Sequence, residues 1–254
     1  KEQVTDIVEG VKQGKLSMED VDKCVRRMLE YIVLTPHFNG YKADNNPNLK
    51  ANAIVSREVA DEGMVLLKNN GVLPLGGKTK KPTRVSLYGT GSYNFLSGGV
   101  GSGCVHTPYI IDLVQGLKNV GIETTSDLTE IYKKYIDYAK LKFEADRSGF
   151  RWFEAPLMGD QKMPEIDITH ELLKKQLKQS DMAIITISRQ AGEGIDRKID
   201  GEFNLTPQEM KMIQDVSTAY HGENKPVIVV INSGSVIETT SWSAYPDAIL
   251  LAWQ

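Results

Sequence analysis

Residues 182–188 read MAIITIS, a short apolar run typical of a strand that is buried on both faces of a sheet. Three similar runs occur in the chain: RVSLYG at 84–89, PVIVVI at 226–231 and AILLAW at 248–253. Helical stretches at 108–119 and 206–220 lie between these runs. Because right-handed crossovers place such helices on both faces of a parallel sheet, the pattern predicts an open α/β/α sandwich with a mostly parallel sheet.

The composition is that of a soluble globular protein with one or two cores. Of the 254 residues, 41% are hydrophobic and 25% are charged, which excludes a disordered or fibrous chain. The net charge of −3 offers no basic surface, so we expect neither a nucleic acid nor a membrane as partner. No apolar stretch reaches the roughly 18 residues of a membrane helix, and the first residues lack a secretory pattern. The sequence therefore favours the cytoplasm over the periplasm or secretion.

The spacing of cysteines and histidines does not predict a metal site. Cys24 and Cys104 lie in different segments without a CxxC pattern, and the four histidines are scattered. Among the histidines, only His106 follows an unusual segment, a glycine-rich stretch. We therefore expect no metal and no cofactor.

The first 50 residues differ from the α/β pattern that follows them. Residues 3–33 predict two amphipathic helices that break at Gly14, the second with Ser17 as its N-cap. Two short helices are marginal alone in water, so we expect them to pack on a domain that the chain enters midway. A linker rich in Pro, Asn and Gly follows, and then a helix over 51–64. The predicted domains are terminal helices at 1–35, a linker at 36–50 and a sandwich at 51–254.

A glycine-rich loop follows the first strand of the predicted sandwich. Residues 88–103, YGTGSYNFLSGGVGSG, hold six glycines, but they fit neither the dinucleotide fingerprint nor the phosphate-loop signature. A nucleotide-binding α/β domain is therefore disfavoured. Glycine here favours tight turns and a close approach of the backbone to another domain or to a ligand.

A second unusual loop follows the MAIITIS run. Residues 189–206, RQAGEGIDRKIDGEFNLT, set Glu193 between Gly192 and Gly194. One interpretation is an ordinary flexible acidic loop, since loops are polar by default. The other is a carboxylic acid carried on a mobile segment to do chemistry.

The residues beside this glutamate favour the second interpretation. Asp196 and Arg197 could form an ion pair that holds the base of the loop and leaves Glu193 free to move. The sequence contains no convincing second carboxylate, serine elbow or Cys/His pair that would complete an active site. Any catalysis must then be shared with a part outside this sequence.

Five stretches resemble the second half of glycoside hydrolase family 3 enzymes, most closely the bacterial β-glucosidases. They are EVADEGMVLLKNNGVLPL, SGGVGSG, SRQAGEGIDRK, VIVVINSGSVIETTSW and AILLAWQ, in the family's order over most of the chain. In that family a (β/α)8-like barrel precedes an α/β sandwich, so the resemblance implies that residues 1–35 are the last helices of the barrel. It also implies that the aspartate nucleophile lies on the barrel, upstream of Lys1, and that the sandwich is truncated at its C-terminus.

The resemblance implies a role for the loop around Glu193. Retaining glycosidases use one carboxyl group as nucleophile and another as general acid and then base. In related enzymes with a GEG loop, the glutamate of that loop is the acid/base, and the matching residue here is Glu193. Four neighbours would support the loop: Gly192, Gly194, Asp196 and Arg197.

Two further groups of residues take expected roles from the same resemblance. Four glycines would form an interdomain loop: Gly98, Gly99, Gly101 and Gly103. Trp152 and Phe153, in SGFRWFEAPLMGD at 148–160, could stack on a sugar on the aglycone side. A hydrophobic plug on the domain is an equal alternative for these aromatic side chains.

These expectations describe one part of a retaining β-glucosidase that hydrolyses terminal β-D-glucosyl residues. The expected partners are a β-glucoside or oligosaccharide substrate and the barrel domain, with a homodimer left open. The isolated chain is expected to be inactive, because one of the two carboxylates is absent from it. The alternative is a non-catalytic carbohydrate-binding or scaffolding sandwich.

Overall fold

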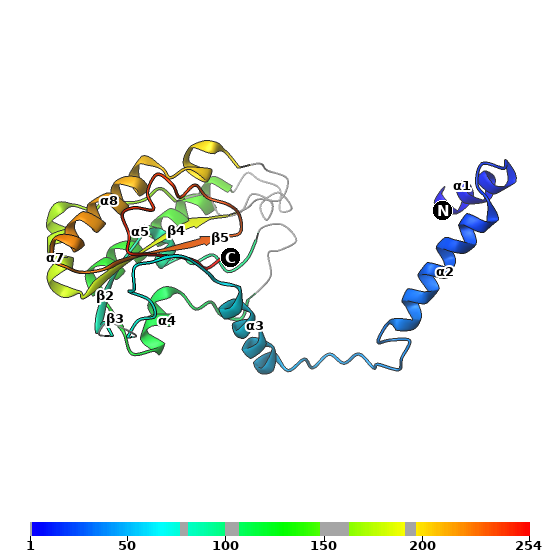
Figure 1. Cartoon of the computed structure of the whole chain (residues 1–254), viewed down its shortest axis with the longest axis horizontal. Helices are drawn as coiled ribbons and strands as arrows, with labels where there is room; N and C mark the ends of the chain where they lie inside the picture. The colour runs from blue at the N-terminus through cyan, green and yellow to red at the C-terminus, as the bar shows by residue number, and fades with distance from the viewer. Residues whose placement is uncertain (1, 77–80, 100–106, 148–162, 191–196) are drawn as a thin grey trace. The chain divides into compact units, whose positions relative to one another are not determined.

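The computed structural model describes residues 2–76, 81–99, 107–147, 163–190 and 197–254 (Figure 1). The chain divides into two compact units, Lys1–Val55 and Ser56–Gln254. The division falls inside helix α3 (Leu49–Gly63), which covers most of the helix predicted over 51–64. The predicted domain boundaries at 35 and 50 stay a prediction.

The first unit holds the two helices that its amphipathic periodicity predicts. They are α1 (Glu2–Lys12) and α2 (Met18–Leu34), and Gly14 lies between them with a φ of +66°. Ser17 is the N-cap of α2, where its hydroxyl accepts a hydrogen bond from the Asp20 N–H at 3.1 Å. Within the described chain α2 buries none of its residues, so its apolar stripe stays exposed.

Within the described residues, six strands form a single sheet in the second unit. Their order across the sheet is β1-β6-β5-β4-β2-β3. Strand β1 pairs antiparallel with β6, and the other neighbouring strands pair in parallel. The strands are β1 (Val65–Asn69), β2 (Arg84–Tyr88), β3 (Glu123–Thr124), β4 (Met182–Arg189), β5 (Val227–Ser233) and β6 (Ala248–Leu251). The prediction of a mostly parallel α/β sheet is confirmed.

Helices cover both faces of this sheet (Figure 1). On one face lie α5 (Ser126–Arg147), α7 (His170–Gln179) and α8 (Pro207–Gly222), and α4 (Leu113–Asn119) lies on the other. A contact fixes α5 beside α8, because the Tyr132 hydroxyl lies 3.9 Å from the Met212 sulfur. A helix on each face of a parallel sheet is what right-handed crossovers require.

The core lies between the sheet and these helices. Every residue of β5 is buried, and in β4 only Ser188 is partly exposed. Central strands of a covered parallel sheet are therefore continuous apolar runs, which is why their sequences predicted them. In contrast, β1 at the sheet edge leaves Leu66 48% and Leu67 51% exposed.

The structure corrects the prediction in several places. The helix predicted over 108–119 begins only at Leu113, because the Asp112 side chain caps it by accepting from the Gln115 N–H at 2.8 Å. The strand predicted over 248–253 ends at Leu251. Among the elements of the described residues, the sequence did not predict β1, β3, α5, α7, η1 (Thr90–Ser92) and η3 (Ile199–Phe203).

The order of the strands places a switch point between β2 and β4. The chain leaves β2 toward β3 on one side of it, then returns to form β4 on the other side. In open parallel sheets, ligands bind beyond the carboxyl ends of the strands at such a switch point. Both unusual loops of the sequence begin there, since one follows β2 and the other follows β4.

Gly89 holds the turn after β2 in a conformation that other residues tolerate poorly. Its φ is +88°, and a Cβ atom added to it would lie 2.3 Å from the carbonyl oxygen of Thr186 in β4. We predict that Gly89→Ala lowers the free energy of unfolding by about 3 kcal/mol or more, from left-handed strain plus overpacking. Urea denaturation followed by circular dichroism measures the loss.

Gly121 provides the matched control for that substitution. Its φ is +76°, but an added Cβ would meet nothing within 4 Å. Gly121→Ala should therefore cost only the left-handed strain, about 1–2 kcal/mol. Equal losses in the two variants would show that the close approach of the loop to β4 contributes nothing.

Candidate functional site

The structure describes some of the predicted site residues and not others. Glu193, Gly192, Gly194 and Asp196 lie outside the described residues. The same holds for Trp152, Phe153, Gly101, Gly103 and His106. Arg197, Gly98 and Gly99 are described. The site is therefore built from the residues that flank the loops at the carboxyl edge of the sheet.

The loop after β2 is fixed by hydrogen bonds to its backbone. The Gly89 N–H donates to the Tyr132 hydroxyl of α5 at 2.9 Å. Thr90 donates to the Glu165 carboxylate through its N–H, at 2.9 Å, and through its hydroxyl, at 2.7 Å. These contacts hold the short 3-10 helix η1 (Thr90–Ser92) over the end of β2.

The first two glycines of this loop lie close to strand β4 of the same domain, whereas the predicted approach to another domain or to a ligand stays a prediction. Cβ atoms added to Gly89 and Gly91 would clash with Thr186 and Ser188 of β4, the latter at 2.1 Å from the Ser188 hydroxyl. At Gly99 an added Cβ would meet nothing within 4 Å of the described chain. The predicted interdomain role of Gly98, Gly99, Gly101 and Gly103 stays a prediction.

The end of β4 carries a buried ion pair that the sequence analysis missed. Arg189, the last residue of β4, donates from Nη1 to Glu209 Oε1 at 2.7 Å and from Nη2 to Glu209 Oε2 at 2.8 Å. Both side chains are only 3% exposed. Two parallel charge-assisted hydrogen bonds of this kind fix the guanidinium in one orientation.

Glu209 also caps the N-terminus of helix α8. It is the third residue of α8 in a capping box, where Oε2 accepts from the Thr206 N–H at 2.8 Å and the Thr206 hydroxyl at 2.9 Å. The residues Thr206 to Glu209, TPQE, carry this signature in the sequence, so the cap could have been predicted. Its pairing with Arg189 could not, because that contact requires β4 and α8 to be placed.

Arg197 lies at the far end of the same loop and is held by three acceptors. Its Nη1 donates to the Ser235 hydroxyl at 2.6 Å and to the Val236 carbonyl at 2.5 Å, and its Nη2 donates to the Glu202 carbonyl. The Arg189 Nε donates to that same Glu202 carbonyl at 2.9 Å. The two arginines that flank residues 190–196 therefore share one acceptor.

The electrostatics of this cluster follow from its burial. Burial lowers the pKa of the Arg197 guanidinium, and the positive charge of Arg189 lowers it further. Glu202 opposes this shift of the pKa. Arg197 keeps its positive charge at neutral pH, because a guanidinium in a protein does not lose its proton there. The predicted Asp196–Arg197 ion pair involves a residue outside the described chain and stays a prediction.

Asn232, at the end of β5, joins the remaining loops to the site. Its Oδ1 accepts from the Leu96 N–H at 2.7 Å, and its Nδ2 donates to the Leu96 carbonyl at 3.0 Å. The same amide nitrogen donates to the Trp253 carbonyl at 2.7 Å. The backbones that follow β2 and β6 are therefore fixed to the end of β5 by one buried side chain.

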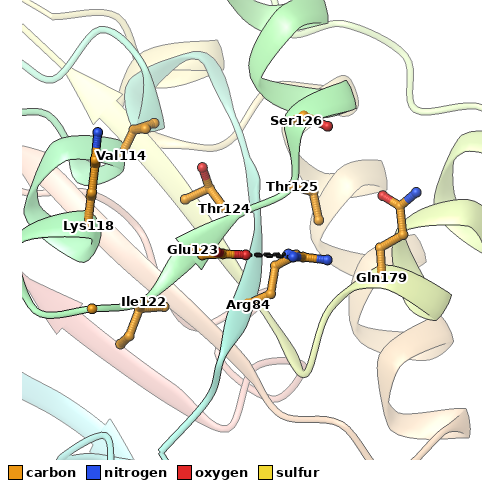
Figure 2. A pocket seen from close by; sticks show the side chains of 10 residues that line it. Arg84, Val114, Lys118, Ile122, Glu123, Thr124, Thr125, Ser126 and Gln179 are labelled. Carbon is orange, nitrogen blue, oxygen red and sulfur yellow. Dashed lines mark hydrogen bonds and ion pairs between the residues drawn. The ribbon is translucent and has the colours of Figure 1, made fainter.

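A separate cavity of about 670 Å³ lies at the opposite edge of the sheet (Figure 2). Arg84, the first residue of β2, forms an ion pair there with Glu123 of β3 at 2.5 Å. Lys118, Thr124 and Gln179 also line this cavity. It lies at the amino ends of the strands, away from both unusual loops, so we do not assign the site to it.

The described residues show neither a cluster of metal ligands nor a membrane-spanning helix. In the described part of the chain, no group of three His, Cys, Asp or Glu side chains could hold a metal ion. Among the helices described, none is both long and apolar enough to cross a membrane.

Together these features define an α/β domain with a parallel sheet. Hydrogen bonds fix the residues that flank two loops at the switch point of this sheet. Residues 64–254 match the model of the glycosyl hydrolase family 3 C-terminal domain. The chain therefore belongs to glycosyl hydrolase family 3.

Similar proteins agree with this assignment. The chain is 37% identical to β-glucosidase A of Butyrivibrio fibrisolvens over 79% of this chain and 25% of that protein. The structure of β-glucosidase 3B from Thermotoga neapolitana in complex with α-D-glucose matches all of this chain with a TM-score of 0.82 and 37% identity. This chain covers 34% of that structure, so it spans a quarter to a third of the length of these relatives.

The buried pair leads to a prediction about stability. Glu209→Gln leaves the Arg189 charge buried without its partner, which should lower the free energy of unfolding by about 3–5 kcal/mol. The double substitution Arg189→Met with Glu209→Leu removes both charges and fills the same space, so it should lose less than either single change. Urea denaturation of the wild type, Arg189→Met, Glu209→Leu and the double variant gives the coupling free energy. Strictly additive losses would contradict a direct interaction between the two side chains.

Proposed function

We propose that this chain is the acid/base domain of a retaining β-glucosidase, with Glu193 as the general acid and base. The nucleophile would be an aspartate on a barrel domain outside residues 1–254. The observation that carries the proposal is the fixing of Arg189 and Arg197, on either side of Glu193, to the Glu202 carbonyl in a chain of this family. Family relatives named β-glucosidases support terminal β-D-glucosyl residues as substrates.

The proposed chemistry needs two carboxyl groups about 5–5.5 Å apart, as in other retaining glycosidases. The Glu193 carboxyl donates its proton to the glycosidic oxygen while the barrel aspartate attacks the anomeric carbon, and the aglycone leaves as an alcohol. The Glu193 carboxylate then takes a proton from water, whose oxygen displaces the aspartate from the sugar. Glucose is released, and Glu193 is protonated for the next cycle.

The remaining residues keep their proposed roles within this scheme. Trp152 and Phe153 would line the aglycone side, and the four glycines Gly98, Gly99, Gly101 and Gly103 would face the barrel. Residues 1–35 would be the last helices of the barrel domain, and residues 36–50 the linker to the sandwich. A carboxylic acid brought from a second domain excludes water as the site closes, which strengthens its interactions with developing charge.

The isolated chain of 254 residues should not hydrolyse β-glucosides, because the proposed nucleophile lies outside it. The test uses the purified chain, free of host enzymes, with 4-nitrophenyl β-glucoside. Addition of the barrel domain in one polypeptide should give turnover. Turnover by the chain alone would overturn the division of the two carboxylates between domains.

Glu193→Ala in the protein with its barrel domain should separate substrates by their leaving groups. Protonation by a positioned acid contributes about 10²–10⁴-fold, and poor leaving groups need it most. Alkyl glucosides should lose most of their rate, and 2,4-dinitrophenyl glucoside should still form the glycosyl-enzyme. Azide, which needs no general base, should then restore turnover and give the β-glucosyl azide. Steady-state and burst kinetics measure these effects.

Two outcomes of that experiment would point elsewhere. Equal losses on activated and unactivated glucosides, with no effect of azide, would exclude Glu193 and make Asp196 the next residue to test. Unchanged activity on all substrates would favour the alternative, a non-catalytic carbohydrate-binding or scaffolding domain.

A further inference from the structure

A cavity of about 670 Å³ lies at the amino ends of β2 and β3, away from the loops of the candidate site (Figure 2). Binding sites for small molecules have volumes of roughly 300–1,000 Å³, so this cavity has room for one such ligand. The residues that line it belong to the second unit and to the described part of the chain. It is therefore a second place on this domain where a small molecule could bind.

We propose that this cavity binds a small molecule that carries a phosphate or carboxylate group. Among the described residues that line it, Arg84 and Lys118 are positively charged and only Glu123 is negatively charged. Arginine and lysine are the side chains that bind such oxyanions, arginine through its planar fork and lysine as a point charge. The inference does not rest on the proposed function, since none of these residues has a role in the proposed catalysis.

The ion pair with Glu123 uses only part of the Arg84 guanidinium. The Arg84 Nε and Nη2 both donate to Glu123 Oε2, at 3.1 Å and 2.5 Å. Within the described chain, the Arg84 side chain makes no other hydrogen bond. Because a guanidinium has five N–H donors, several of them remain for a ligand. The side chain is 47% exposed, so these donors are accessible from solvent.

The backbone beneath this ion pair is held in place. The Asp181 carboxylate accepts from the Thr83 N–H at 2.7 Å and from the Arg84 N–H at 3.1 Å. The Thr83 carbonyl in turn accepts from the Glu123 N–H at 2.9 Å. Arg84 and Glu123 are direct partners in the parallel pairing of β2 with β3. The register of the two strands therefore sets the ion pair before a ligand binds, and such preorganisation lowers the cost of binding.

Lys118 provides the second positive charge from a different element. It lines the cavity from helix α4, whereas the ion pair belongs to strands β2 and β3 (Figure 2). Within the described residues, its ammonium group forms no ion pair and no hydrogen bond, so its charge is available to a ligand. Thr124 and Ser126 also line the cavity, and their hydroxyl groups can donate to an oxyanion.

Two other classes of ligand fit the cavity less well. For a metal ion, Glu123 is the only carboxylate among the described lining residues, and Arg84 already occupies one of its oxygens. For a neutral sugar, none of the described lining residues offers an aromatic ring to stack on. Ile122, which is 2% exposed, and Val114 provide apolar contact for the body of a ligand. The charged side chains therefore decide the class of ligand, an oxyanion on a small body.

The experiment measures binding to the full protein with its barrel domain by isothermal titration calorimetry. The three probes are glucose 6-phosphate, glucuronate and glucose, which share a sugar ring and differ at carbon 6. We expect the affinity of the cavity to fall in that order, because a phosphate group carries a charge of about −1.5 to −2, a carboxylate about −1 and glucose none. Raising the ionic strength from about 0.05 M to about 0.5 M should weaken the binding of both anions, because salt screens exposed charges.

Three substitutions locate the binding in the cavity. Lys118→Ala should weaken the binding of glucose 6-phosphate about tenfold, because it removes a hydrogen bond to a charged group. Arg84→Met should also weaken it, since it leaves Glu123 in the cavity without its partner. Glu123→Gln should raise the affinity about threefold or more, because it removes the charge that repels the anion and releases the Arg84 fork. Glucose bound at the catalytic site should be unaffected by any of the three substitutions, which separates it from binding in the cavity.

Lys174→Ala is the matched control. Lys174 is an exposed lysine of α7 that does not line the cavity, so its loss should leave the affinity for glucose 6-phosphate unchanged. The inference is overturned if neither anion binds, if Lys118→Ala and Lys174→Ala bind glucose 6-phosphate equally, or if Glu123→Gln weakens the binding. The last result would instead indicate a neutral sugar or a cation as the ligand. The ratio of the two anion affinities tells whether phosphate or carboxylate is the preferred group.

Discussion

The bidentate ion pair between Arg189 and Glu209 connects strand β4, helix α8 and the turn at Glu202. Arg189 is the last residue of β4, Glu209 belongs to the capping box of α8, and the Arg189 Nε donates to the carbonyl of Glu202. Two charges at 3% exposure are costly to desolvate, and replacing such a pair by apolar residues is often neutral or stabilising. Its value here lies in geometry, since a forked pair fixes the orientation of both side chains.

The strand order explains why this geometry matters. Strands β2 and β4 are neighbours, yet their connections leave in opposite directions across the sheet. The loop after β2 lies so close to β4 that only glycine fits at Gly89 and Gly91 without displacing Thr186 or Ser188. The loop after β2 is therefore held by close backbone approach, and the two arginines that flank the loop after β4 both donate to the Glu202 carbonyl. Asn232 holds the backbones that follow β2 and β6 at the same edge.

Much of the fold followed from the sequence because its central strands are buried on both faces. Runs such as MAIITIS predicted β4 directly, and the TPQE box marks the start of α8. The edge strand β1 was missed because its apolar run is only three residues long and follows α3 almost directly, and β3 was missed because it has only two residues. At the site, glycine patterns and family resemblance pointed to the loops. The Arg189–Glu209 contact joins residues 20 positions apart, so no local pattern could indicate it.

The central proposal is that Glu193, between Arg189 and Arg197 in the sequence, works opposite a carboxylate on a second domain. A crystal structure of the full protein with glucose bound measures this claim directly. The account predicts that the Glu193 carboxyl group lies about 5–5.5 Å from an aspartate carboxyl of the barrel, with both arginines on the Glu202 carbonyl. A separation of about 6.5–9.5 Å is the geometry of an inverting enzyme and would contradict the account, as would a Glu193 side chain directed away from the sugar.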